Sequence, residues 1–111
     1  ENVNPGFNNV AEFRHHSWWN DEVYSVFTQN KIIFCGMSHP FLPDKIIKTH
    51  PLMYYRFHGV PQLYASPYDR KDLKEVVKKI KLKKATAAFA YFNNDINAAA
   101  VSNAQEMKEL V

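Results

Sequence analysis

The sequence contains one cysteine and three glycines among its 111 residues. A single cysteine cannot form a disulfide within the chain and favours a reducing compartment, so the cytoplasm is the expected location. There is no glycine-rich phosphate loop, so the sequence gives no indication of a nucleotide cofactor, and the identity of any cofactor is left open. It also lacks the uninterrupted run of about 18 apolar residues that a membrane-spanning helix requires, so we expect no membrane contact. The chain starts at Glu1 instead of methionine, which suggests a trimmed product.

The composition is that of a globular protein, with 46% hydrophobic and 14% aromatic residues, and the length predicts a single domain over residues 1–111. The net charge is +3, which is too mild to identify a nucleic-acid-binding protein by itself. The basic residues gather between residues 70 and 84. This segment is interpreted as the solvated face of a helix followed by a basic turn, and the alternative is a patch that attracts phosphates.

Strand patterns alternate with helix patterns along the chain. We predict strands over 10–15, 31–37, 52–59 and 85–92, and helices over 20–30, 69–81 and 98–110. Such alternation is typical of an α/β fold with parallel strands. Three prolines between residues 38 and 51 argue against a long regular helix there, and a connection of this length is often functional.

Local signals fix the helix ends and faces. Asn20 and Asp69 are expected to cap the first and second helices, because their side-chain oxygens can accept from free backbone N–H groups. The third helix is expected to turn four residues inward: Ala100, Ala104, Met107 and Val111.

Two polar residues interrupt the apolar strand over 52–59. Arg56 and His58 are two apart, so both side chains leave the same face of the strand. A polar pair on a buried strand costs free energy unless other groups satisfy it. Glu12 and Arg14 share a face of the first predicted strand in the same way. These residues are therefore the first candidates for a functional site.

Four ordered motifs resemble one known family. They are Glu12–Trp18 (EFRHHSW), Phe34–Pro43, Tyr55–Gly59 (YRFHG) and Tyr91–Asn94 (YFNN), followed by Asn103-Ala104. The family is domain of unknown function 72, the YecE-like proteins, although His16 stands where its pattern has proline. The resemblance implies a TIM-type β/α barrel whose biochemical role is not settled.

A complete barrel of this type takes about 250 residues. The resemblance therefore implies a parallel half-barrel of about four strands and three helices, corresponding to the carboxy-terminal half. A half-barrel exposes two sheet edges, and exposed edges invite pairing. We expect either self-association or contact with the missing amino-terminal half-barrel.

In barrels of this type the working groups lie at the carboxyl ends of the strands. This rule gathers residues from four strand ends: His15, His16, Ser17, Ser38, His39, Arg56, His58, Gly59, Asn93, Asn94 and Asp95. Arg56 is interpreted as an anion clamp or as the internal ion partner of Glu12, and Arg14 is interpreted similarly. Asn93 and Asn94 either orient an anionic ligand or form a turn and a helix cap.

Three hypotheses of function follow. In the first, the protein is a hydrolase acting on an anionic substrate, with Arg56 holding the anion, His58 transferring a proton and Glu12 orienting one of them. In the second, it is a nucleic-acid-binding module that uses the basic segment. In the third, it is a non-catalytic fragment stabilised by self-association.

Metal and thiol chemistry are not favoured by the sequence. His16, His39 and His58 are candidate ligands, but they lack the tight spacing of a known metal motif, so we predict no metal site. Cys35 lies within an apolar strand and is interpreted as a buried, inert thiol.

Overall fold

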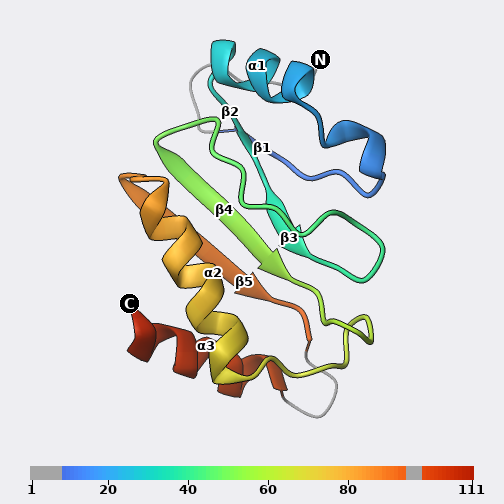
Figure 1. The fold of residues 1–111 in the computed structure, drawn as a ribbon, viewed down its shortest axis with the longest axis vertical. Helices are drawn as coiled ribbons and strands as arrows, with labels where there is room; N and C mark the ends of the chain where they lie inside the picture. The colour runs from blue at the N-terminus through green and yellow to red at the C-terminus, as the bar shows by residue number, and fades with distance from the viewer. Residues whose placement is uncertain (1–8, 95–98) are drawn as a thin grey trace.

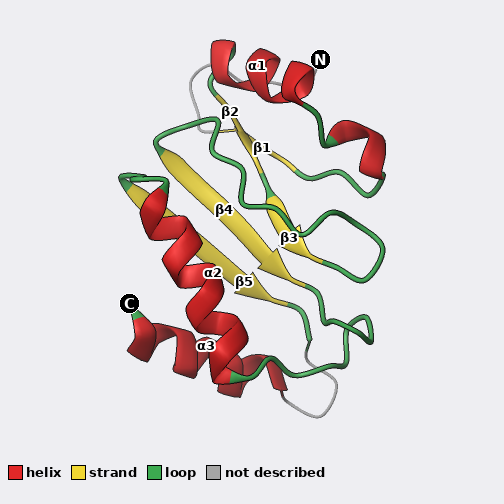
Figure 2. Ribbon diagram, viewed as in Figure 1, coloured by secondary structure: helices red, strands yellow, loops and turns green. Residues whose placement is uncertain are grey.

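The computed structural model of the chain describes residues 9–94 and 99–111 (Figure 1). Its elements in chain order are β1 (Asn9–Ala11), the 3₁₀ helix η1 (His16–Trp18), α1 (Asp21–Gln29), β2 (Ile32–Phe34), β3 (Gly36–Ser38), β4 (Leu52–Phe57), α2 (Arg70–Leu82), β5 (Ala87–Phe92) and α3 (Ala99–Leu110). Every strand pairing among them is parallel. The predicted α/β class is confirmed, and the arrangement is that of a partial barrel (Figure 2).

The predicted strand over 31–37 is wrong in one respect, because it is two short strands with different partners. β2 pairs with β1, whereas β3 pairs with β4, which in turn pairs with β5. The break falls at Cys35, whose N–H donates to the carbonyl of Ala11 at 2.9 Å. At Gly36 an added Cβ would lie 3.0 Å from both the Lys45 carbonyl and the Tyr55 ring, so glycine permits this close approach.

The predicted strand over 10–15 is also shorter in the structure, because β1 ends at Ala11. The chain then leaves the sheet towards η1, which the pattern did not predict. Phe13 lies at this exit, stacked on Trp18 with ring centroids 4.2 Å apart. Aromatic packing therefore holds the segment that carries Glu12 and Arg14.

β4 lies between β3 and β5 in a three-stranded sheet, and its side chains point alternately to the two faces of that sheet. Tyr55 and Phe57 are buried in a core with Leu73 and Val77 of α2. Successive residues of a strand point to opposite faces, so the side chain of Arg56 points away from α2. Figure 1 shows α2 lying across β4 and β5.

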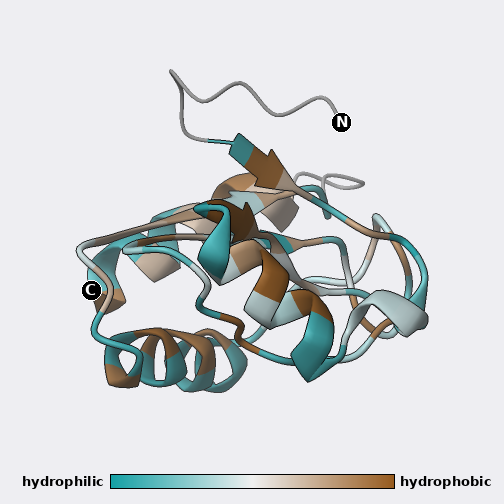
Figure 3. Ribbon diagram, turned by 90° about the horizontal axis from the view of Figure 1, so that it is seen from above, coloured by the Kyte–Doolittle hydropathy of each residue, from teal (hydrophilic) through white to brown (hydrophobic). Residues whose placement is uncertain are grey.

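Both predicted helix caps are confirmed. The side chain of Asn20 accepts from the backbone N–H of Val23, and that of Asp69 accepts from the N–H of Asp72. In Figure 3 the helix ribbons carry both hydrophobic and hydrophilic residues, as expected of amphipathic helices. No helix in the ranges 9–94 and 99–111 is long and apolar enough to cross a membrane.

The prediction of which α3 residues are buried is partly wrong. Ala100 and Met107 are buried, but Ala104 is exposed and Val111 is 74% exposed. Asn103 is buried instead, at 2% exposure, because its side chain bonds to the backbone of another segment. Ala98, the predicted first residue of this helix, lies outside the described residues.

A second core lies between α1 and the sheet around Phe34, which has no exposed surface. Four aromatic rings contact it at centroid distances of 5.2–5.7 Å: Phe13, Trp19, Tyr24 and Phe27. Cys35 follows it in the chain and is 1% exposed. Burial raises the pKa of this thiol to about 12, in agreement with the predicted inert cysteine.

Candidate functional site

The carboxylate of Glu12 joins the polar residues that the sequence singled out. Its Oε1 accepts from Nη1 of Arg56 at 2.7 Å. Its Oε2 lies 3.1 Å from Nε2 of His58 and 3.5 Å from Nη2 of Arg14. We call these four residues the Glu12 cluster. One acidic group therefore binds three basic side chains from two distant segments.

β4 places two members of the cluster, because Arg56 lies on it and His58 follows it directly. Arg56 is in register with Tyr91 of β5, two residues before Asn93. The N–H of Asn93 donates to the carbonyl of Phe57 at 2.7 Å, which continues the ladder beyond the strand. Nε of Arg56 then donates to Oδ1 of Asn93 at 3.1 Å, and Nη2 donates to the same oxygen. The predicted proximity of Arg56, Glu12 and Asn93 is thus present in the structure.

His58 is fully buried, and its backbone N–H donates to the carbonyl of Ser38 at 2.9 Å. Burial lowers the pKa of its imidazole, although the hydrogen bond to Glu12 opposes this shift. A neutral ring next to a carboxylate carries its proton on Nε2 and donates it to Glu12. Nδ1 is then an acceptor, and it has no hydrogen-bond partner among the described residues.

The next residue, Gly59, has φ of +104°, and an added Cβ would lie 2.6 Å from the Gln62 carbonyl. Only glycine fits this turn without strain. Its N–H donates to the hydroxyl of Tyr68 at 2.9 Å.

Glu12 is ionised in this setting. Burial alone would raise the pKa of its carboxyl, but the hydrogen bond from His58 and the charges of Arg56 and Arg14 outweigh burial and lower it. The cluster therefore holds one negative charge and two positive charges around a neutral imidazole.

Both shifts make folding stability depend on pH in the same direction. A carboxyl with a lowered folded pKa loses its contribution as pH falls through its ordinary value of 4.5 towards the folded value. A histidine with a lowered folded pKa is protonated first in the unfolded chain, so stability is lost as pH falls below 6.5. We expect the urea midpoint to be highest above about pH 7 and to fall on acidification. A midpoint that is flat or that rises between about pH 7.5 and 4 would contradict this assignment.

An open depression of about 430 Å³ lies beside the cluster on the face of the sheet opposite α2. Glu12, Arg56 and Asn93 line it together with Tyr54 and Tyr91. The side chain of Arg56 retains 30% exposure, whereas His58 does not line the depression. Arg56 is therefore the cluster member at which a ligand meets both a charge and free N–H groups.

Asn94, which was predicted to bind an anion beside Asn93, lies elsewhere. It is fully buried, and its Nδ2 donates to Oδ1 of Asn103 at 2.8 Å and to the carbonyl of Ser66 at 3.1 Å. Asn103 in turn accepts from the N–H of Tyr68 at 2.9 Å. The Tyr68 hydroxyl donates to Ser38 at 2.7 Å. This network joins the ends of β3 and β5 to α3. In the sequence its signal was the motif that joins Asn94 to Asn103, which carries the family resemblance but does not show that the two side chains meet.

The remaining strand-end residues are not assembled into one site. His15 and His16 stack on each other at the surface, 4.5 Å between ring centroids. The His39 ring lies 5.6 Å from that of His58. Asp95 lies outside the described residues. Among the residues that are described, no group of three acidic, histidine or cysteine side chains is placed to hold a metal ion.

The basic segment lies on α2 and the turn after it, on the opposite side of β4 from Arg56. Its lysines are exposed, in agreement with the predicted solvated face: Lys71, Lys74, Lys78, Lys79, Lys81, Lys83 and Lys84. One bound ligand cannot readily contact both this surface and the depression, because the sheet separates them. Nucleic-acid binding stays a prediction.

A family described as "Protein of unknown function DUF72" matches residues 2–111. A DUF72 family protein from Thermotoga maritima is similar in structure, with a TM-score of 0.85 and 25% identity over 94% of this chain. One from Enterococcus faecalis has a TM-score of 0.82 and 18% identity over 93% of this chain. The chain covers 46% of each of these two solved structures. The comparison with curated proteins gives no match.

Proposed function

The chain belongs to the DUF72 family of proteins of unknown function, and within it we propose that the Glu12 cluster and Asn93 form a binding site for a small anion. The ligand class is a phosphate or a carboxylate. Arg56 lies at the carboxyl end of β4 and Asn93 directly after β5, and barrel enzymes of the TIM type carry their working groups at such strand ends, which supports the proposal.

The observation that carries this proposal is the excess of positive charge at a partly buried site. Two guanidinium groups, Arg56 and Arg14, share the single carboxylate of Glu12. His58 adds no negative charge, since a histidine is neutral or positive. An anion in the depression would balance the charge in surroundings that screen it less than bulk water does.

The donors of Arg56 support the same conclusion. A guanidinium has five N–H groups in a planar fork that matches carboxylate and phosphate. Three are used, one with Glu12 and two with Asn93. Of the N–H groups on the two Nη atoms, one on each is left for a ligand. Tyr54 and Tyr91, which also line the depression, offer aromatic surface to the organic part of such a ligand.

We extend this proposal to hydrolysis of the bound anionic substrate. Glu12 is the carboxylate that lines the depression, so it would accept a proton from a water molecule. His58 donates to Glu12 and holds its orientation, which makes it a positioning residue. Arg56 would stabilise charge on the anionic substrate.

Anion binding is tested by titrating inorganic phosphate, and separately acetate, into the chain and following NMR chemical shifts. Arg56→Ala should abolish saturable binding. Arg56→Lys keeps the charge but not the fork, so we expect about tenfold weaker binding. Arg70→Ala is the matched control, because Arg70 also pairs with one carboxylate, that of Glu109 at 3.3 Å, but lies on α2.

If the parent and Arg56→Lys bound phosphate with equal affinity, recognition by the planar guanidinium group would be contradicted. If Arg70→Ala weakened anion binding as much as Arg56→Ala does, the effect would come from the lower net charge of the chain and not from this site. Far-UV circular dichroism of each variant establishes that the fold is retained.

A further inference from the structure

Tyr64 lies in the loop between β4 and α2, in a backbone conformation that aromatic residues rarely adopt. Its φ is +62°, in the left-handed region that favours glycine and asparagine. The chain turns there, because the N–H of Ala65 donates to the carbonyl of Gln62 at 3.1 Å, and Tyr64 is the third residue of that turn. A bulky residue in this region is strained, and strained residues cluster at functional sites.

Two other non-glycine residues in the part of the chain that the structure describes have a positive φ, and the ends of helices explain both. Lys31, with φ of +56°, directly follows Asn30, the C-cap of α1. Lys84, with φ of +55°, directly follows Lys83, the C-cap of α2. A left-handed residue at this position closes many helices. Tyr64 follows a strand and a loop, so helix termination does not account for its conformation.

Hydrogen bonds within the loop maintain the strained turn. The N–H of Gln62 donates to Oγ of Ser66 at 2.8 Å, and the N–H of Ser66 donates to the carbonyl of Gln62 at 2.9 Å. Gly59 leaves room for the turn, since an added Cβ there would lie 2.9 Å from the backbone nitrogen of Tyr64. The loop therefore fixes where the Tyr64 side chain begins.

The contacts of Tyr64 connect it to two members of the Glu12 cluster. Its hydroxyl accepts from Nη1 of Arg14 at 3.5 Å. Its backbone N–H donates to the carbonyl of His58, and its ring centroid lies 5.9 Å from that of the imidazole. Arg14 precedes η1 and His58 follows β4, so Tyr64 bridges two segments that are distant in the sequence.

Arg14 depends on such a contact to stay beside the cluster. Its side chain is 50% exposed, and its Nη2 lies 3.5 Å from Oε2 of Glu12. An ion pair that is half exposed to water contributes little by itself, and a long side chain loses rotamer freedom when it is held in one place. The Tyr64 hydroxyl gives the guanidinium a second fixed partner, at its other Nη atom.

We propose that Tyr64 is a positioning residue of the anion site, whose hydroxyl holds Arg14 beside Glu12 so that the site keeps its second positive charge. This inference rests on the proposed function, because the excess of positive charge is what would bind the anion. It also accounts for the strained turn: tyrosine stands where asparagine would fit the backbone better, because the side chain serves the site and not the fold.

Phosphate titration followed by NMR chemical shifts tests the proposal. Tyr64→Phe removes only the hydroxyl, and we expect it to weaken phosphate binding about fivefold, the effect of losing one hydrogen bond to a charged group. Arg14→Ala should weaken binding at least as much. The double variant should bind no more weakly than Arg14→Ala alone, because Tyr64 acts through Arg14.

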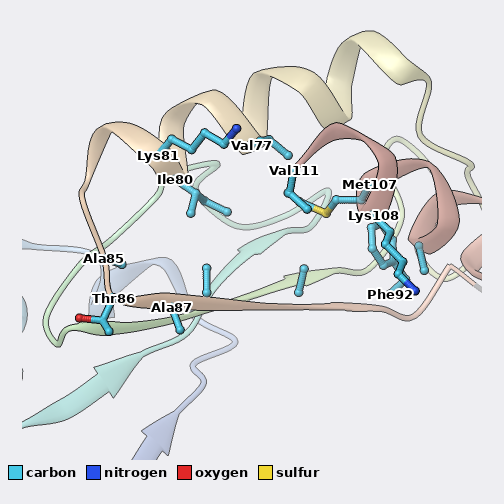
Figure 4. Close-up of a pocket in the computed structure, with 13 residues that line it drawn as sticks. Val77, Ile80, Lys81, Ala85, Thr86, Ala87, Phe92, Met107, Lys108 and Val111 are labelled. Carbon is cyan, nitrogen blue, oxygen red and sulfur yellow. The ribbon is translucent and has the colours of Figure 1, made fainter.

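Two controls match these changes at other places in the chain. Tyr24→Phe also removes a hydroxyl, but the Tyr24 hydroxyl is buried without a hydrogen-bond partner among the described residues. Lys108→Ala removes one positive charge, as Arg14→Ala does. Lys108 lines the apolar groove between α2, α3 and β5, on the helix side of the sheet (Figure 4). Both control variants should bind phosphate as the parent does.

A second measurement needs no anion. The charge of Arg14 lowers the pKa of His58, so the release of Arg14 should raise that pKa. An NMR titration of the imidazole without phosphate should therefore give a higher pKa in Tyr64→Phe and in Arg14→Ala than in the parent. The other charged or titratable groups near the imidazole, Glu12, Arg56 and His39, are the same in every variant.

A third measurement separates the site from the fold. Tyr64→Asn also removes the hydroxyl, but asparagine tolerates a positive φ. We expect its urea midpoint to be no lower than that of the parent, while its phosphate binding weakens as in Tyr64→Phe.

Parental phosphate affinity in Tyr64→Phe would overturn the proposal, and so would an unchanged pKa of His58. A lower urea midpoint in Tyr64→Asn would also overturn it, because tyrosine would then serve the fold. If the parent itself shows no saturable phosphate binding, the proposed function fails. The His58 titration then still decides whether Tyr64 holds Arg14, so the two failures can be told apart.

Discussion

Replacing Phe34 by alanine is expected to destabilise the chain by about 3–5 kcal/mol, the cost of deleting a large buried aromatic side chain. Phe34 has no exposed surface and is the centre of the core between α1 and the sheet. Its loss leaves a cavity beside four aromatic rings and removes their contacts with it. A loss of this size is a large part of the total stability of a small domain. We therefore expect the variant to be largely unfolded in urea concentrations at which the parent is folded.

The measurement is urea unfolding followed by circular dichroism. Phe41→Ala is the control, because Phe41 is 77% exposed and its truncation should change stability by no more than about 0.5 kcal/mol. Phe34→Leu retains part of the volume and should fall between the two. If Phe34→Ala and Phe41→Ala lowered the free energy of unfolding by the same amount, the core between α1 and the sheet would not form as described.

Replacing Glu12 by glutamine is expected to lower stability by about 2 kcal/mol and, at the same time, to strengthen anion binding. Glutamine keeps one oxygen but replaces the other by an NH₂ group, which cannot accept from His58 and Arg14. A buried imidazole N–H is then left without an acceptor, which accounts for the loss of stability. The positive charge of Arg56 is no longer neutralised by a carboxylate, so an added phosphate meets less competition.

Urea unfolding and a phosphate titration of the same variant measure both effects. The control is Glu109→Gln, since Glu109 is 68% exposed and pairs with Arg70 at the surface, where an ion pair contributes little. Unchanged stability would show that the cluster is not a structural link. Weaker phosphate binding by Glu12→Gln would show that the carboxylate helps to hold the ligand. It would contradict the expectation that Glu12 competes with phosphate for Arg56.

The local elements could be predicted from the sequence because each rests on short-range physics. Asn20 and Asp69 cap helices through bonds to residues three positions away. β4 was recognisable from a run of apolar and aromatic residues that only Arg56 interrupts. The meeting of Glu12 and Arg56 could also be anticipated, since two oppositely charged residues on inward faces each require a partner.

Other features depend on contacts that no local pattern encodes. The break at Cys35 arises because the chain changes neighbours there, from β1 to β4. Asn103 replaces an apolar residue on the inner face of α3 because the backbone of Tyr68 requires a donor and an acceptor at that place. Asn94 joins the same network, so its separation from Asn93 was invisible in the sequence.

The buried thiol of Cys35 gives the chain a built-in kinetic reporter. A thiol reagent reacts only with the thiolate, and this thiol is 1% exposed with its pKa raised to about 12. Labelling must therefore wait for the structure around Cys35 to open. With no second cysteine in the sequence, each modified molecule records one such opening. The labelling rate then measures how often the structure around Cys35 opens.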